Sequence, residues 1–112
     1  MQTNQATSDR LQPADFQKAL ASGEYTLLDI RTIEEYNEGH LKDAIQKDFY
    51  LTDSFTQYLQ SLDKNKKYLI YCRSGNRSGK ALTQMKGMGF TNVADLEGGI
   101  GAWTAANLPL EK

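Results

Sequence analysis

Three short apolar runs dominate the pattern of hydrophobic and polar positions along the chain. They cover residues 25–30, 67–71 and 92–96, and the second run, Lys67-Tyr68-Leu69-Ile70-Tyr71, gives the strongest signal. The run over residues 25–30 is nearly continuous rather than alternating, which is typical of a strand covered on both faces of a parallel sheet. Each run lies between segments with helical signals. The pattern therefore predicts an α/β domain built on a parallel sheet.

The segments between these runs carry the start and stop signals of helices. Thr32 followed by Glu35 forms a capping box, which predicts that a short helix begins there. Thr52 or Asp53 is expected to cap the next helix, and Gly89 is expected to end the one after it. Helices are predicted over residues 13–20, over 34–37, from about 52, over 77–88 and over 101–106.

Composition and charge limit the classes of function. The chain has 112 residues, of which 39% are hydrophobic, and this composition suits one soluble domain. Its formal net charge is −1 and it contains no basic run, so the charge gives no support to nucleic-acid or membrane binding. Residues 1–9 are polar and are expected to be disordered, leaving 10–112 as the domain. A single cysteine favours a reducing cytoplasm, with a periplasmic or exported location as the alternative if a leader is removed.

The candidate chemistry is concentrated in the polar loop that follows the strongest strand. The loop reads Cys72-Arg73-Ser74-Gly75-Asn76-Arg77-Ser78. Ligands of parallel α/β sheets sit beyond the carboxyl ends of the strands, which is where Cys72 is placed. Successive backbone N–H groups of such a loop converge on one point, and the following helix adds partial positive charge there. Together with the charges of Arg73 and Arg77, these groups favour the thiolate of Cys72.

Three segments in order resemble the rhodanese-like sulfurtransferases. The loop from Cys72 to Ser78 resembles the active-site loop of the family's single-domain members. Two further segments resemble the family's N-terminal and C-terminal signatures, namely Leu28-Asp29-Ile30-Arg31 with Glu34-Glu35-Tyr36 and Gly39-His40-Leu41, and Gly98-Gly99-Ile100-Gly101-Ala102-Trp103. The resemblance covers residues 11–109, which is nearly the whole chain.

The resemblance implies a single rhodanese-like domain with a five-stranded parallel sheet, helices on both faces, and no cofactor or metal. Cys72 is then the nucleophile that takes sulfane sulfur from thiosulfate or a similar small anionic donor, holds it as a persulfide and passes it to cyanide or a thiol. A protein sulfur donor or acceptor is an alternative partner. Arg73 is expected to bind the anionic donor, and the backbones of Ser74, Gly75 and Asn76 are expected to form the anion nest.

The other polar residues around the loop are expected to have structural roles. Arg77 is expected to brace the loop from the start of its helix, and Ser78 to be a helix N-terminal residue. Asp29 ends a buried strand at the same sheet edge, where it hydrogen-bonds either to the loop or to Arg31. Arg31 and Glu35, four residues apart, are expected to form an ion pair.

Two rival functions are compatible with a cysteine in an anion nest. Phosphatases and arsenate reductases of this fold use a Cys-x5-Arg loop, which would need arginine where this chain has Ser78. Only four residues separate Cys72 from Arg77, and the smaller nest favours a sulfur atom over a tetrahedral phosphate. The second rival, a protein-coupled sulfur relay or a binding module, is left open by the sequence.

Overall fold

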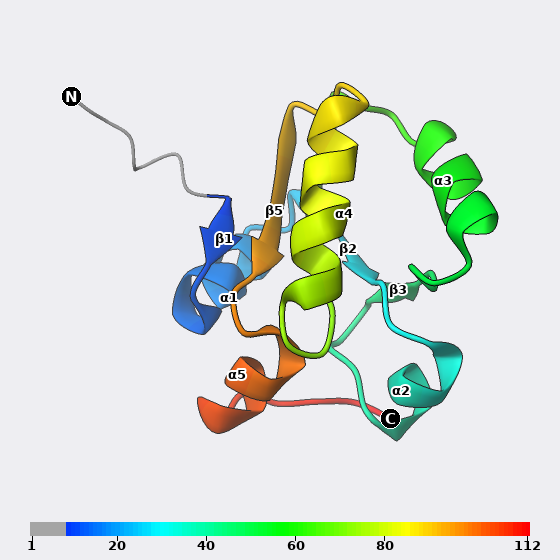
Figure 1. Cartoon of the computed structure of the whole chain (residues 1–112). Helices are drawn as coiled ribbons and strands as arrows, with labels where there is room; N and C mark the ends of the chain where they lie inside the picture. Colours follow the sequence, from blue (N-terminus) through cyan, green and yellow to red (C-terminus); the bar gives the residue numbers. More distant parts are fainter. Residues whose placement is uncertain (1–8) are drawn as a thin grey trace.

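Five parallel strands form one sheet in the order β1-β5-β4-β2-β3 in a computed structural model that describes residues 9–112 (Figure 1). The five-stranded parallel sheet implied by the resemblance is therefore confirmed. The two edge strands are only two residues long, too short to leave a periodic signal in the sequence. The strands are β1 Arg10–Leu11, β2 Tyr25–Asp29, β3 Ile45–Gln46, β4 Lys67–Tyr71 and β5 Asn92–Leu96.

The N-terminal segment expected to be disordered falls almost entirely on residues 1–8, which lie outside the described residues. Its last residue, Asp9, is described. The Asp9 carbonyl accepts a hydrogen bond of 2.8 Å from the backbone N–H of Asp95 on β5. This hydrogen bond lies directly before β1, whose first residue, Arg10, pairs with Asp95 of β5.

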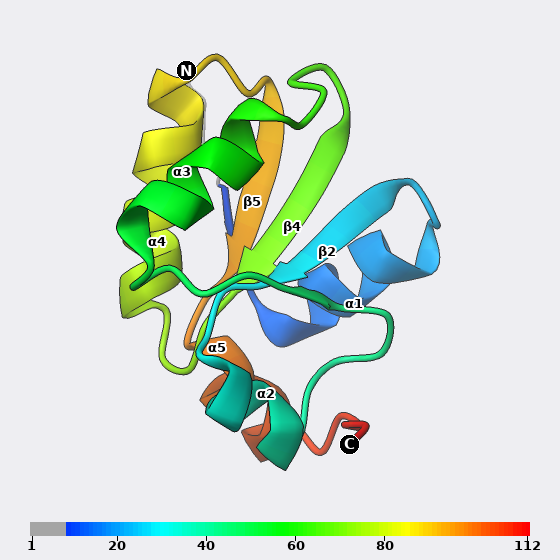
Figure 2. The ribbon, with the colours of Figure 1, turned by 90° about the vertical axis from the view of Figure 1, so that its right-hand side faces the viewer.

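Helices cover both faces of the sheet, as predicted (Figure 2). The capping box of Thr32 and Glu35 is present and begins α2. The predicted cap of α3 is wrong: the helix begins at Thr52 itself, so the N-cap is Leu51, which offers no side-chain acceptor. The helices are α1 Pro13–Ala21, α2 Ile33–Glu38, α3 Thr52–Gln60, α4 Asn76–Gly87 and α5 Gly99–Ala105. In the described chain, none of them has the length and apolar character needed to cross a membrane.

The sheet separates two hydrophobic clusters. On one face α3 and α4 pack against β2, β4 and β5, and on the other face α1 and α5 do so. Cys72 belongs to the first cluster, together with Phe55 of α3 and Met85 of α4. Trp103 of α5 belongs to the second and meets the ring of Phe16 edge-on, with centroids 6.2 Å apart. Burial on both faces explains why β2 and β4 appear in the sequence as nearly continuous apolar runs.

A buried polar cluster joins the carboxyl ends of β2 and β4. The Asp29 carboxylate, with no exposed surface, accepts from the Arg31 guanidinium at 2.6 Å and from the Tyr71 hydroxyl at 2.5 Å. The Tyr71 hydroxyl in turn accepts from the backbone N–H of Leu41 at 3.0 Å. The expected ion pair of Arg31 with Glu35 is therefore wrong, because Asp29 is the partner of Arg31 inside the protein.

Replacing Asp29 with alanine should destabilise the fold by about 3–5 kcal/mol, because it leaves the buried Arg31 charge without its counterion. Urea unfolding measures this loss. The control Glu24→Ala removes the exposed ion pair with Lys67 and should have a much smaller effect. Equal losses in the two variants would contradict the importance of the buried cluster.

Candidate active site

The loop after β4 closes around the sulfur of Cys72. The backbone N–H of Gly75 donates to the Cys72 Sγ at 3.1 Å, and that of Ser78 donates at 3.3 Å. Gly75 reaches this position with φ of +97°, a conformation that side-chain-bearing residues rarely adopt. Cys72 itself is 1% exposed, so the sulfur lies at the floor of the loop. N–H donors of this kind stabilise a sulfur anion.

Further backbone N–H groups of the loop have no acceptor among residues 9–112. Two lie before Gly75 and two lie in the first turn of α4, where helix geometry leaves N–H groups without an intrahelical partner. The residues are Arg73, Ser74, Asn76 and Arg77. The N-terminus of α4 adds partial positive charge to the same region. The loop therefore combines donors on the sulfur with donors that are available to an anion.

The N-terminus of α5 holds the loop from the other side. The N–H of Ile100 donates to the Cys72 carbonyl at 2.9 Å, and that of Gly101 donates to the Arg73 carbonyl at 3.1 Å. Gly99 permits this approach, because a Cβ there would lie 2.5 Å from the Arg73 carbonyl carbon. The Gly98-Gly99 pair was visible in the sequence, but its contact with the loop depends on the tertiary fold.

Arg77 braces the loop against α2. Its guanidinium makes two hydrogen bonds to the Glu35 carboxylate, of 2.8 and 2.9 Å, and lies 5.0 Å from the ring centre of Tyr50. This contact, together with the capping box of Thr32, lowers the pKa of Glu35 from its ordinary value of 4.5 to about 2. The charge of Arg77 is thus largely committed to a protein carboxylate.

A second carboxylate lies behind the sulfur, and no local pattern in the sequence indicates it. The thiol of Cys72 lies 3.5 Å from the Ser78 hydroxyl, which donates to Asp95 at 2.7 Å. Asp95 also binds Arg10 of β1 through two hydrogen bonds of 2.7 and 3.0 Å. Ser78 is fully buried, so it is more than the helix N-terminal residue expected from the sequence. Pairing of β1 with β5 brings Arg10 here, which no local pattern indicates.

Arg73 is exposed and has no ion pair within the described chain. It lines a hollow of about 300 Å³ together with Arg31, Glu38 and Thr104. Ser74 and Asn76 are also exposed, whereas Asp29 hydrogen-bonds to Arg31 and Tyr71 rather than to the loop. Of the predicted site residues, the loop members therefore lie together, and Asp29 supports the sheet edge beside them.

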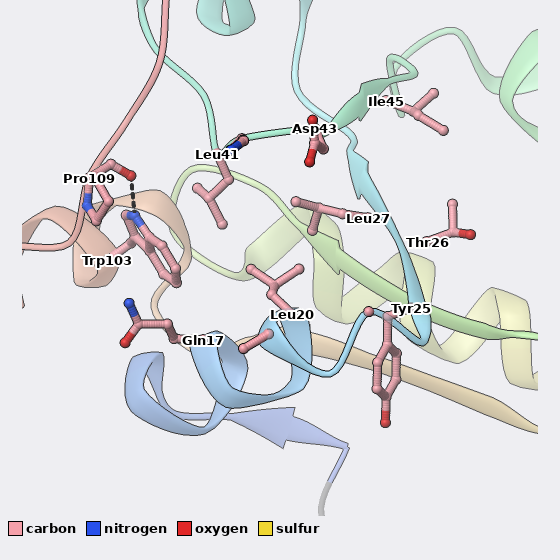
Figure 3. A pocket seen from close by; sticks show the side chains of 13 residues that line it. Gln17, Leu20, Tyr25, Thr26, Leu27, Leu41, Asp43, Ile45, Trp103 and Pro109 are labelled. Atoms are coloured by element: carbon pink, nitrogen blue, oxygen red, sulfur yellow. Dashed lines mark hydrogen bonds between the residues drawn. The ribbon is translucent and has the colours of Figure 1, made fainter.

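A larger hollow, of about 510 Å³, lies near α1 and β2 (Figure 3). Its apolar wall includes Leu20, Leu27 and Leu41, and Trp103 donates to the Pro109 carbonyl at its rim. Cys72 and Arg73 are not among its lining residues. The loop that carries Cys72 is accordingly the better candidate for chemistry.

The model of the rhodanese-like domain family matches residues 12–106. The chain belongs to this family. A curated sulfurtransferase of Allochromatium vinosum is 37% identical over 84 residues, which cover 75% of this chain and 76% of that protein. The resemblance noted in the sequence, which covers residues 11–109, therefore agrees with the family model over most of the chain.

Other members differ in length and in name. A tRNA uridine(34) hydroxylase of Bdellovibrio bacteriovorus is 31% identical over 86% of this rhodanese-like chain, which spans 28% of that protein's length. The crystal structure of a rhodanese-related protein from Thermoplasma volcanium has 28% identity and a TM-score of 0.78, covering 91% of this chain and 96% of the other. In eight of the curated relatives, the chain spans between 28% and 76% of the relative's length.

The low pKa of Glu35 predicts how stability depends on pH. Because the folded-state pKa lies below the ordinary value, the contribution of Glu35 is fully present above about pH 4.5 and is lost as the pH falls towards 2. Glu35→Gln keeps a capping-box acceptor but loses the charge, so it should lower stability at neutral pH by about 1 kcal/mol. Unfolding curves of the two proteins should converge by about pH 2.

Glu34 provides a matched control, because it lies on the same turn of α2 and is exposed. Glu34→Gln should leave the pH dependence of unfolding close to that of the unmodified protein. A Glu35→Gln variant with an unchanged acid profile would show that the pairing with Arg77 does not stabilise the fold.

Proposed function

We propose that this rhodanese-like domain is a sulfurtransferase that carries sulfane sulfur as a persulfide on Cys72. The observation that carries the proposal is the arrangement of backbone donors: two N–H groups bind the sulfur, and four more in the same loop have no acceptor among residues 9–112. A persulfide is an anion with its outer sulfur beyond Sγ. The four N–H groups without an acceptor belong to the same loop as Cys72, and we infer that they bind such a sulfur or the oxygens of a donor anion.

The reaction proceeds in two displacements at sulfur. The Cys72 thiolate attacks the outer sulfur of thiosulfate; the new S–S bond forms while the bond to the sulfonate group breaks, and sulfite leaves with the electron pair. Cyanide or a thiolate then attacks the outer sulfur of the persulfide. That sulfur departs as thiocyanate or a new persulfide, and the Cys72 thiolate is regenerated. The cycle needs neither an external oxidant nor a reductant.

Arg73 is the residue suited to bind the anionic donor. Arg77 is paired with Glu35 and Arg31 with Asp29, whereas the exposed Arg73 has no carboxylate partner in the described chain. Arg73 also lines the hollow of about 300 Å³ beside the loop. This division of charge supports Arg73 as the binding group and Arg77 as the brace.

The sulfurtransferase function is favoured over the phosphatase function by loop size. The closing Arg77 follows Cys72 after four residues, and Gly75 and Ser78 both contact the Sγ directly. A tight loop of this kind suits one sulfur atom above the cysteine. The 37% identical relative named sulfurtransferase supports the same choice.

The central test is the intact mass of the protein after incubation with thiosulfate. The protein should gain about 32 Da, one sulfur atom, and lose it when cyanide is added, because the persulfide sulfur is electrophilic. Cys72→Ala should show neither change. A gain of sulfur in Cys72→Ala would overturn the assignment. If the reduced wild-type protein gains no mass, a protein-coupled sulfur relay is favoured instead. A protein persulfide donor would then replace thiosulfate in the same measurement.

Arg73→Ala should raise the thiosulfate concentration needed for half-maximal thiocyanate formation by about tenfold, the loss typical of one charge-assisted hydrogen bond. The unfolding free energy should change little, because Arg73 is exposed. Lys18→Ala removes an equal charge from α1 and serves as the control. If both variants need the same thiosulfate concentration as the wild type, Arg73 does not bind the donor.

A further inference from the structure

A chain of hydrogen bonds runs from the sulfur to the edge strand β1. It passes from Cys72 to the Ser78 hydroxyl (3.5 Å), from Ser78 to the Asp95 carboxylate (2.7 Å), and from Asp95 to Arg10. Asp95 has no exposed surface, whereas the side chain of Arg10 is 42% exposed. A buried carboxylate thus lies one hydroxyl group away from the nucleophile and carries its counterion on the solvent side.

The Ser78 hydroxyl has a single hydrogen, and that hydrogen is directed to Asp95. Its oxygen therefore faces the sulfur as an acceptor, which suits the thiol. The backbone N–H groups of Gly75 and Ser78 face the same sulfur as donors, which suits the thiolate. The two sets of contacts therefore act in opposite directions on the Cys72 sulfur.

Arg10 contacts both the carboxylate and the loop. Its Nη2 donates to the Gly75 carbonyl at 2.6 Å as well as to Asp95 at 2.7 Å. A Cβ on Gly75 would lie 3.0 Å from the same nitrogen, so glycine leaves room for the guanidinium. The carbonyl that Arg10 holds belongs to the residue whose N–H binds the sulfur, so Arg10 fixes both the loop geometry and the charge behind it.

Other charged groups also face Cys72. Arg73 adjoins it in the loop, and Arg77 of α4 interacts with it while paired to Glu35 of α2. Behind the sulfur, the charges are those of Asp95 on β5 and Arg10 on β1. The pKa of Arg10 is raised, mainly by its hydrogen bond to Asp95 and in smaller part by the charge of Cys72. Arg10 is thus within electrostatic reach of the nucleophile.

We propose that Arg10 and Asp95 are positioning residues that act through Ser78 and Gly75 to set the pH at which the Cys72 thiol loses its proton. This inference deepens the proposed function, because it concerns the same nucleophile. The buried Asp95 charge opposes the thiolate, and the Arg10 charge favours it. A purely structural role of the pair would instead require only that the loop be held in place.

The electrostatic and the purely structural role are separated by two single variants, which should shift the pH midpoint of thiolate formation in opposite directions. The pH midpoint of thiolate formation is read from ultraviolet absorbance, with Cys72→Ala subtracted as the blank. Asp95→Asn removes the opposing charge and should lower the midpoint by about one pH unit. Arg10→Gln leaves Asp95 uncompensated and should raise it by about one pH unit. The double variant should return to within about half a unit of the wild type, since both charges are gone.

The design remains decisive if Arg10→Gln fails to fold with its buried carboxylate unpaired. Asp95→Asn and the double variant contain no such carboxylate. Their pH midpoints then test the proposal without Arg10→Gln. Lys86→Gln is the matched control, because Lys86 pairs with Asp9 next to Arg10 but is exposed on α4; its midpoint should be that of the wild type. A midpoint that rises or stays unchanged in Asp95→Asn overturns the proposal.

The titration requires no sulfur donor, so its outcome is independent of the persulfide assay. If neither thiosulfate nor a protein persulfide donor loads Cys72 but the midpoints shift as predicted, the sulfurtransferase function is rejected and the effect of Arg10 and Asp95 on Cys72 stands. Successful sulfur transfer with unmoved midpoints would reject the positioning roles of Arg10 and Asp95 alone.

Discussion

The contact of two backbone N–H groups with one sulfur is the interaction on which the rest of the site depends. A loop bent tightly enough to bring Gly75 and Ser78 to the Cys72 Sγ leaves its own carbonyls facing outwards, and these must find partners elsewhere. They are supplied by the N-terminus of α5 and by Arg10 of β1. Elements from both ends of the chain therefore meet at one turn, which explains why the site needs the whole domain.

Pairing of charges decides which arginine is available to a ligand. Arg31, Arg77 and Arg10 each bind a carboxylate, respectively Asp29, Glu35 and Asp95. In each pair the carboxylate holds the guanidinium in one geometry. Arg31 is held at the sheet edge, Arg77 against α2, and Arg10 behind the sulfur. Arg73 is left facing solvent beside a hollow of about 300 Å³. Three of these four arginines are thus paired with carboxylates, and Arg73 is the one without a carboxylate partner in the described chain.

The sheet order explains why these pairs form at the same place. β4 lies between β2 and β5, and all strands are parallel, so their carboxyl ends reach a common edge. Asp29 ends β2, Cys72 follows β4, and Asp95 lies near the end of β5. The hydrophobic clusters on the two faces hold the strands in this register, and the polar residues at their ends then have fixed neighbours.

The sequence by itself determined the three central strands, the helices between them and the loop that carries Cys72. Burial on both faces leaves a continuous apolar run, the capping box of Thr32 and Glu35 is a local contact, and the loop residues are contiguous. It did not reveal the two-residue edge strands, whose pairing depends on distant residues, and it assigned Arg31 the wrong partner because sequence spacing favoured Glu35 over the buried Asp29. The tertiary structure alone decided that Glu35 binds Arg77, that Gly99 packs against Arg73, and that Arg10 and Asp95 lie behind the sulfur. Contacts between residues 26 to 85 positions apart are set by sheet order and helix packing, which no local pattern encodes.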